Sequence, residues 1–129
     1  MAQILVVDDD RDIATMLKFA LAKDGHDVTA VFSGPEALAA LGIEPPDAGK
    51  LPPALAILDV MMPGMDGLEV GERMHADPRT KDVPVLLLTA QSGMDERDSK
   101  ANIADRIEKP IDPRNLCEIV NGILEIGGF

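Results

Sequence analysis

The sequence predicts an α/β fold, in which a doubly wound, five-stranded parallel sheet is flanked by five helices. Two observations lead to this fold class. Short apolar runs alternate along the chain with segments whose apolar residues recur at helical spacing. Acidic or polar residues directly follow several of the apolar runs. Successive strand and helix units imply a parallel sheet with helices on both faces, since crossover connections are right-handed.

The predicted strands are short runs rich in aliphatic residues. A continuous run such as Ile4-Leu5-Val6-Val7 is typical of a strand that is buried on both faces of a sheet. Such runs predict strands at residues 3–7, 28–32, 54–58, 83–88 and 105–108.

The predicted helices combine helical spacing with signals at their ends. Ser33 and Glu36 have the spacing of a capping box, and Asp112 precedes Pro113 at the first position of the last helix. The segment 92–101 has few apolar anchors among its charged residues. Helices are predicted at residues 10–23, 35–41, 67–75 and 92–101 and from 113 to a stop at Gly127, with turns or caps at Asp24-Gly25 and Asp66-Gly67.

Length and charge limit the class of protein. A chain of 129 residues is expected to form one domain over residues 1–129. Its formal net charge of −11 repels phosphate backbones and argues against direct nucleic-acid binding. The first residues do not read as a signal peptide, no apolar stretch is as long as a membrane span, and Cys117 is the single cysteine. We therefore expect a cytoplasmic protein that binds proteins and a cation but no membrane.

A loop rich in proline and glycine interrupts the pattern at residues 42–53. It holds four of the ten prolines and is longer than the roughly 2 to 6 residues usual between a helix and a strand. It is expected at the amino ends of the strands. A tolerated surface insertion explains it, and a contact with a specific partner is the alternative.

Several carboxylates and one lysine are expected to meet at one edge of the sheet. Asp8 and Asp9 follow the first strand, Asp59 the third, Thr89 the fourth and Lys109 the fifth. Ligand sites in open α/β sheets lie at this carboxyl edge. Carboxylate oxygens in this number suit Mg²⁺, and a lysine beside them would offset their charge and hold a phosphate. A single Asp at a strand end is more often a turn former or helix cap, so the prediction depends on the whole set.

Four short motifs surround the expected site residues: Ile-Leu-Val-Val-Asp-Asp at 4–9, Leu-Asp-Val-Met-Met-Pro-Gly-Met-Asp-Gly at 58–67, Leu-Thr-Ala at 88–90 and Glu-Lys-Pro at 108–110. With these motifs, the chain resembles a response-regulator receiver domain of two-component signalling over essentially its whole length. The resemblance implies the strand order 2-1-3-4-5 of flavodoxin-like folds and phosphotransfer from a histidine kinase or a phosphotransfer protein of a phosphorelay.

The resemblance also implies roles for the acidic residues and for Met61. Asp59 would be the phosphoryl acceptor. Asp9 would bind Mg²⁺ directly and Asp8 mostly through water, with Asp59 and the backbone carbonyl of Met61 as further ligands.

The remaining roles concern phosphoryl stabilisation and output. Lys109 would pair with the phosphoryl group, before a cis bond to Pro110, and Thr89 would donate its hydroxyl to a phosphoryl oxygen. Met61 and Gln91 occupy positions that tune dephosphorylation in the family. Output would change contacts with a downstream protein, or form a homodimer, through the face of residues 92–123.

One position departs from the family. Receivers usually carry an aromatic residue three positions before the lysine, where this chain has Arg106. We expect output to rely on an ion pair of Arg106 with an acid of the segment 95–98, or on ordering of that helix. A solvated arginine without a role is the plain alternative.

Two other functions remain open at this stage. A Mg²⁺-dependent phosphatase with an aspartyl-phosphate intermediate typically needs a second acid where this chain has Met61, which argues against an enzyme. A receiver-like module that is never phosphorylated is the other alternative. His26 and His75 lack ligand spacing and are expected at the surface, and Cys117 is expected to be a small core residue.

Overall fold

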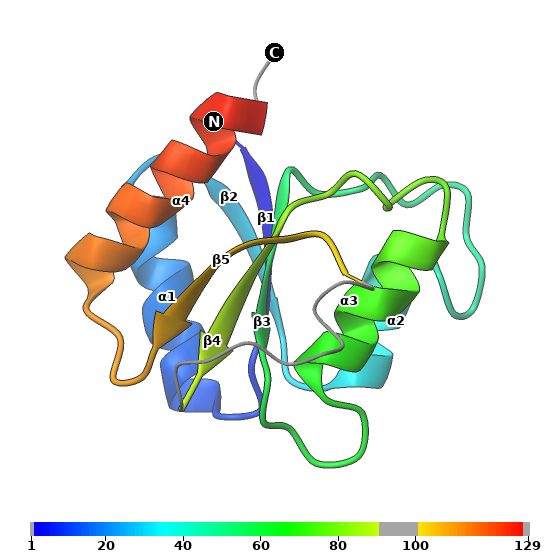
Figure 1. Ribbon diagram of the computed structural model, residues 1–129, viewed down its shortest axis with the longest axis horizontal. Helices are drawn as coiled ribbons and strands as arrows, with labels where there is room; N and C mark the ends of the chain where they lie inside the picture. The colour runs from blue at the N-terminus through cyan, green and yellow to red at the C-terminus, as the bar shows by residue number, and fades with distance from the viewer. Residues whose placement is uncertain (1, 91–100, 128–129) are drawn as a thin grey trace.

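The computed structural model describes residues 2–90 and 101–127 and shows one parallel sheet with helices on both faces (Figure 1). The strand order is β2-β1-β3-β4-β5, as the resemblance implied. The strands are β1 (Gln3–Val7), β2 (Asp27–Val31), β3 (Leu55–Asp59), β4 (Val85–Thr89) and β5 (Ile103–Glu108). The helices are α1 (Arg11–Lys23), α2 (Gly34–Ala40), α3 (Gly67–Ala76) and α4 (Pro113–Gly127).

The described residues contain four helices rather than the five that the sequence predicts. The predicted helix at 92–101 lies outside the described residues, except for Ala101, which belongs to a turn before β5. The other predicted elements are confirmed within one or two residues at each end.

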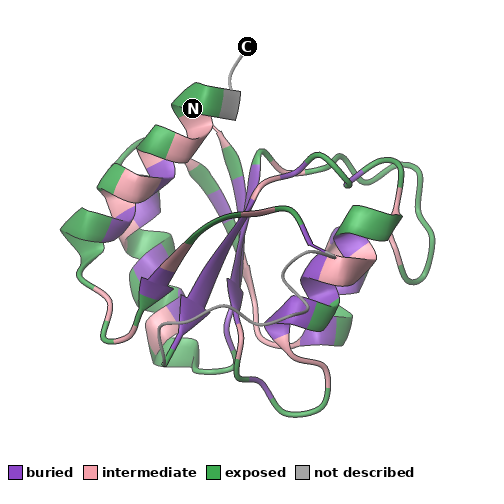
Figure 2. Ribbon diagram, viewed as in Figure 1, coloured by how far each residue is buried: buried purple, intermediate pink, exposed green. Residues whose placement is uncertain are grey.

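Two hydrophobic cores hold the sheet between its helices. On one side, α1 and α4 cover residues that include Val6, Ile57 and Leu88, and on the other side α2 and α3 cover residues that include Val7 and Leu58. Successive residues of β1 and β3 therefore contribute to opposite cores, as the alternation of side chains along a strand requires. Figure 2 shows the central strands buried along their length. This double coverage explains why β1, β3 and β4 read as continuous apolar runs.

Polar side chains fix where the helices begin. Asp10 caps α1 by accepting hydrogen bonds from the backbone N–H groups of Asp12 and Ile13. Ser33 accepts from the N–H of Glu36 at 3.2 Å, while the Glu36 carboxylate accepts from the N–H of Phe32 at 3.1 Å. The predicted capping box therefore exists, with its return bond displaced by one residue.

Gly67 allows helix α3 to start directly beside the end of β3. A side chain at this position would overlap the backbone carbonyl of Asp59, because the first turn of α3 packs against that peptide group. Asp66 caps the helix by accepting from the N–H of Glu69 at 2.9 Å. The predicted cap at Asp66-Gly67 is confirmed, and the glycine has the further role of permitting this close approach.

The loop at 42–53 is tied to the region around α3. The guanidinium of Arg79 donates to the backbone carbonyls of Gly42 and Asp47 at 2.8 and 3.1 Å. Arg73 pairs with Glu44 at 2.9 Å. The loop lies at the amino ends of the strands, away from the carboxyl edge, as expected from its position between α2 and β3.

The prediction that His26 lies at the surface is wrong. Its side chain is 9% exposed, and its Nε2 lies 3.0 Å from the Oδ1 of Asn121 in α4. The reason is a tertiary contact, since α4 packs over the turn before β2. His75 is exposed, as predicted, and Cys117 is half-buried against the core between α1 and α4. Within residues 2–90 and 101–127, no helix is long and apolar enough to cross a membrane.

The two glycines Gly122 and Gly67 predict opposite effects of adding a methyl group. Gly122 lies within α4, where a methyl group would meet open space beside the helix, so Gly122→Ala should raise the free energy of unfolding by about 0.5 to 1 kcal/mol. Gly67→Ala should lower it by about 1 to 3 kcal/mol, because the methyl group displaces α3 from β3. Urea unfolding of both variants measures the two changes in the free energy of unfolding. A stabilising Gly67→Ala would contradict the close packing of α3 on Asp59.

Candidate functional site

The sheet brings the predicted site residues to its carboxyl edge. Asp8 directly follows β1, Asp59 and Thr89 are the last residues of β3 and β4, and Lys109 directly follows β5. Backbone hydrogen bonds continue across this edge, from the N–H of Asp8 to Val31 at 3.2 Å and from the N–H of Lys109 to the carbonyl of Thr89 at 2.8 Å. The side chains are therefore held on backbone that belongs to the sheet.

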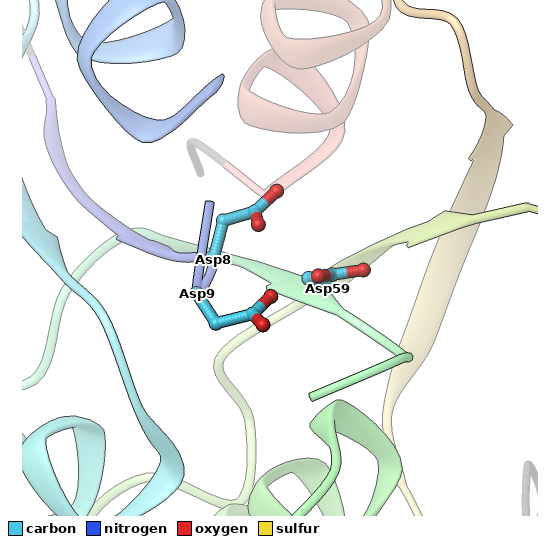
Figure 3. A group of neighbouring side chains, drawn as sticks. All are labelled: Asp8, Asp9 and Asp59. Carbon is cyan, nitrogen blue, oxygen red and sulfur yellow. The ribbon is translucent and has the colours of Figure 1, made fainter. Parts of the chain in front are cut away.

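Three carboxylates converge at this edge. Asp8, Asp9 and Asp59 each offer an oxygen atom such that the three oxygens lie within 4.8 Å of one another. Figure 3 shows Asp8 and Asp9 extending from the end of β1 and Asp59 from the neighbouring strand. Asp8 and Asp59 are 0% and 2% exposed, while Asp9 is exposed. The cluster is thus buried at Asp8 and Asp59 and open to solvent at Asp9.

Lys109 provides the positive charge next to the buried acids. Its Nζ lies 3.2 Å from Oδ1 of Asp59 and 3.4 Å from Oδ2 of Asp8. The ammonium group therefore bridges the two carboxylates that are most buried. Lys109 precedes a cis peptide bond to Pro110, as the resemblance implied.

The surroundings change the acidity of both partners. Burial raises the pKa of Asp59 to about 7, and repulsion from Asp8 adds to this effect, while Lys109 opposes it. Burial lowers the pKa of Lys109, but attraction to Asp59 and Asp8 outweighs burial and leaves this pKa above its ordinary value. The pKa of Asp59 therefore lies near neutral pH, and a cation bound beside its carboxyl group would favour the ionised form.

Backbone and side-chain contacts orient the acids. The N–H of Met61 donates to Oδ1 of Asp59 at 3.3 Å, while the Met61 side chain is 71% exposed at the rim. The N–H of Asp10 donates to Oδ1 of Asp8 at 2.9 Å. Asp10 thus holds the Asp8 carboxylate and caps α1 at once. This role was missed from the sequence, although the run of three aspartates before a helical pattern contains the signal for an N-cap.

Other predicted residues lie around the cluster or outside the described part of the chain. Thr89 is buried at the end of β4, beside Glu108 in the register of β5. Arg106 is half-buried on β5 opposite Leu87. Gln91 and the acids of segment 95–98 lie outside the described residues.

The donor set determines what chemistry this edge supports. Carboxylate oxygens in close proximity suit a hard divalent cation such as Mg²⁺. A buried carboxylate that also contacts an ammonium group suits nucleophilic attack on an anionic phosphorus centre.

Comparisons with known proteins agree with this geometry. Residues 4–121 match the response regulator receiver domain family. Response regulator PleD from Caulobacter vibrioides is 38% identical over 113 residues, which cover 86% of this chain and 23% of PleD. A CheY-like response regulator receiver domain protein from Methanospirillum hungatei has a TM-score of 0.84 at 26% identity, covering 99% of this chain and 97% of that chain.

A second solved structure is the receiver domain of a sensor histidine kinase from Pseudomonas aeruginosa with a magnesium ion coordinated in its active site cleft. It has a TM-score of 0.79 at 22% identity, covering 99% of this chain and 98% of that chain. The present chain spans between 23% and 53% of the length of PleD and of two matching transcriptional regulators. The family match over most of its residues shows that this chain belongs to the response regulator receiver domains, the phosphoacceptor modules of two-component signalling.

Proposed function

We propose that Asp59 is the residue that accepts the phosphoryl group, in a reaction that depends on Mg²⁺. The observation that carries the proposal is the Asp59 carboxylate itself, buried beside two further acids and bridged to Lys109 at 3.2 Å. Residues 1–129 would act as one receiver domain, with the loop at 42–53 as an insertion. The domain would be a signalling module and not a metabolic enzyme.

The acidic cluster fits a magnesium ion. Asp8, Asp9 and Asp59 supply hard oxygen donors within 4.8 Å of one another, and the Met61 carbonyl would complete the protein ligands. The magnesium site of the related Pseudomonas aeruginosa receiver supports the same assignment here. When bound, Mg²⁺ supplies positive charge that offsets repulsion among the carboxylates and the phosphoryl oxygens.

The side chains of this protein would then perform the transfer. An oxygen of Asp59 attacks phosphorus in line, so that an O–P bond forms while the P–N bond of a phosphohistidine breaks. The imidazole leaves with the electron pair and takes a proton from solvent. Lys109 would pair with the incoming phosphoryl oxygens, and the Thr89 hydroxyl would donate a hydrogen bond to one of them.

The donor would be a histidine kinase or a phosphotransfer protein, and the receptor of the signal a downstream protein or a second copy of the chain. The described part of the output surface consists of β5 and α4, where Arg106 replaces the usual aromatic residue. An Arg106 side chain cannot move into an apolar pocket as an aromatic ring does. We therefore assign output to a change in the pairing of Arg106.

Phosphoryl uptake should depend on both Asp59 and Mg²⁺. Incubation with acetyl phosphate and Mg²⁺ should add one phosphoryl group to the chain, and chelation of the metal should abolish the gain. Asp59→Asn should show no gain, because the amide is not a nucleophile of this kind. Intact mass spectrometry measures all three samples. Uptake by a folded Asp59→Asn variant would place the acceptor elsewhere.

Substitution of Lys109 should have effects different from those of substituting a metal ligand. Lys109→Met should slow phosphoryl uptake at least about tenfold, because no ammonium group remains to hold the phosphoryl oxygens. It should also tighten Mg²⁺ binding by about threefold to tenfold, since the metal no longer competes with a cation 3.2 and 3.4 Å from Asp59 and Asp8.

The control for this experiment is Lys81→Met, which removes the same charge from an exposed position before β4. Isothermal titration calorimetry with MgCl₂ and mass spectrometry measure both variants. Loss of Mg²⁺ binding in Lys109→Met alone would indicate that Lys109 supports the cluster and does not compete with the metal.

In metal-free buffer, ionisation of Asp59 should make the stability of the protein depend on pH. The pKa of Asp59 is raised from 3.8 to about 7 in the folded state, so between these values the folded state retains a proton that the unfolded state has lost. Stability therefore falls as pH rises through this window. Asp59→Asn removes this ionisation, so its stability relative to wild type should be about 1 to 3 kcal/mol higher at about pH 8 than at about pH 5.

Urea unfolding with a chelator at both pH values tests the sign. The closely similar shapes of the amide and the protonated carboxyl group make Asp59→Asn a fair mimic of the neutral acid. If the free energy of unfolding differs between Asp59→Asn and wild type by the same amount at both pH values, the raised pKa of Asp59 is contradicted.

A further inference from the structure

Arg11 lies at the acidic edge but takes no part in the cluster described above. It is the first residue of α1 and follows Asp9 by two positions. Its guanidinium carbon lies 4.1 Å from the centre of the Phe32 ring. Phe32 directly follows β2, which pairs with β1 on the side away from β5. The site therefore has a cation on each flank, Lys109 on the β5 side and Arg11 on the β2 side.

The two cations differ in how far their charge is neutralised. Lys109 is paired with two buried carboxylates. Arg11 is exposed, and in residues 2–90 and 101–127 it makes no ion pair or side-chain hydrogen bond. Contact with an aromatic face restricts the arginine without neutralising it. Arg11 thus offers an open positive charge beside the acids.

Helix stability does not account for an arginine at this position. The amino end of a helix carries a partial positive charge, which disfavours a cation in the first turn. The acid at Asp12 and the cap at Asp10 already serve the helix start. The placement of Arg11 therefore points to a role toward something that approaches the edge from solvent.

We propose that Arg11, held over Phe32, is a positioning residue that recruits the anionic phosphodonor to the acidic site. This inference rests on the proposed phosphorylation of Asp59. The donor carries negative charge and must approach an edge that holds Asp8, Asp9 and Asp59 in a chain of net charge −11. A fixed cation on the rim lowers this repulsion during approach.

The expected effect follows from charge and distance. Two opposite unit charges about 8 Å apart in water attract each other enough to change an encounter about twofold, so loss of a cation at a separation of this order should cost about twofold for each negative charge on the donor. Arg11→Ala should therefore lower the second-order rate constant about fourfold with acetyl phosphate, a dianion, and about twofold with phosphoramidate, a monoanion. Both losses should shrink at high salt, where the field is screened.

The experiment measures phosphorylation rates by intact mass at low and high salt with both donors. Lys23→Ala is the matched control, since it removes the same charge from the far end of α1, about 18 Å along the helix axis. Arg11→Lys should retain most of the rate, and Phe32→Leu should lose part of it, because the cation remains but is no longer held. Thermal unfolding of each variant separates a loss of fold from a loss of recruitment.

The outcomes are distinct. A larger loss with the dianion, relieved by salt and absent in Lys23→Ala, supports the proposal. Equal losses with both donors, a loss in Arg11→Lys equal to that in Arg11→Ala, or a loss that follows reduced thermal stability would overturn it. If wild type itself gains no phosphoryl group, the proposed function fails and this inference falls with it, whereas normal uptake by Arg11→Ala overturns this inference alone.

Discussion

The repulsion between the buried carboxylates of Asp8 and Asp59 is the constraint on which the rest of the site depends. The two acids follow neighbouring strands, so the pairing of β1 with β3 forces them together. Both are removed from water, which makes their charges costly unless a cation lies near. Within residues 2–90 and 101–127, Lys109 is the cation that contacts both carboxylates, and the hydrogen bond from its N–H to the end of β4 fixes its backbone there. Carboxylates placed in this way favour the binding of further positive charge.

The surrounding fold prevents the acids from separating. Two cores clamp β1 and β3 from both faces, so neither strand end can shift without opening buried apolar contacts. Gly67 lets α3 press on the Asp59 peptide, and Asp10 ties the Asp8 carboxylate to the start of α1. The stability cost at the carboxyl edge is thus offset by packing elsewhere in the sheet. Charged groups whose burial is costly, held on a rigid body, are typical of functional sites.

The ends of strands were predictable and the contacts between helices were not. The positions and lengths of the apolar runs located Asp8, Asp59 and Thr89, because parallel strands end at a shared edge of the sheet. His26 was misplaced because its burial depends on Asn121, which lies far away in the chain. The anchoring of the loop by Arg79 and the contact of Arg11 with Phe32 were equally invisible, since no local pattern encodes which distant partner a side chain meets. Resemblance to the family predicts the role of a residue only where the sequence matches a family motif. Arg106 departs from the family pattern, so the resemblance predicts no role for it.

The distribution of cations around the acids explains how one edge can both repel and accept phosphate. Lys109 is largely neutralised by the acids it bridges, so its field is weak at a distance and strong only at contact. Arg11 is exposed and unpaired within the described chain, so its field extends toward solvent but lies apart from the reacting oxygen. A contact cation stabilises charge as the O–P bond forms, while a rim cation acts during approach. Because the two act at different stages, changes at Arg11 should alter the salt dependence of the reaction and changes at Lys109 should alter its limiting rate.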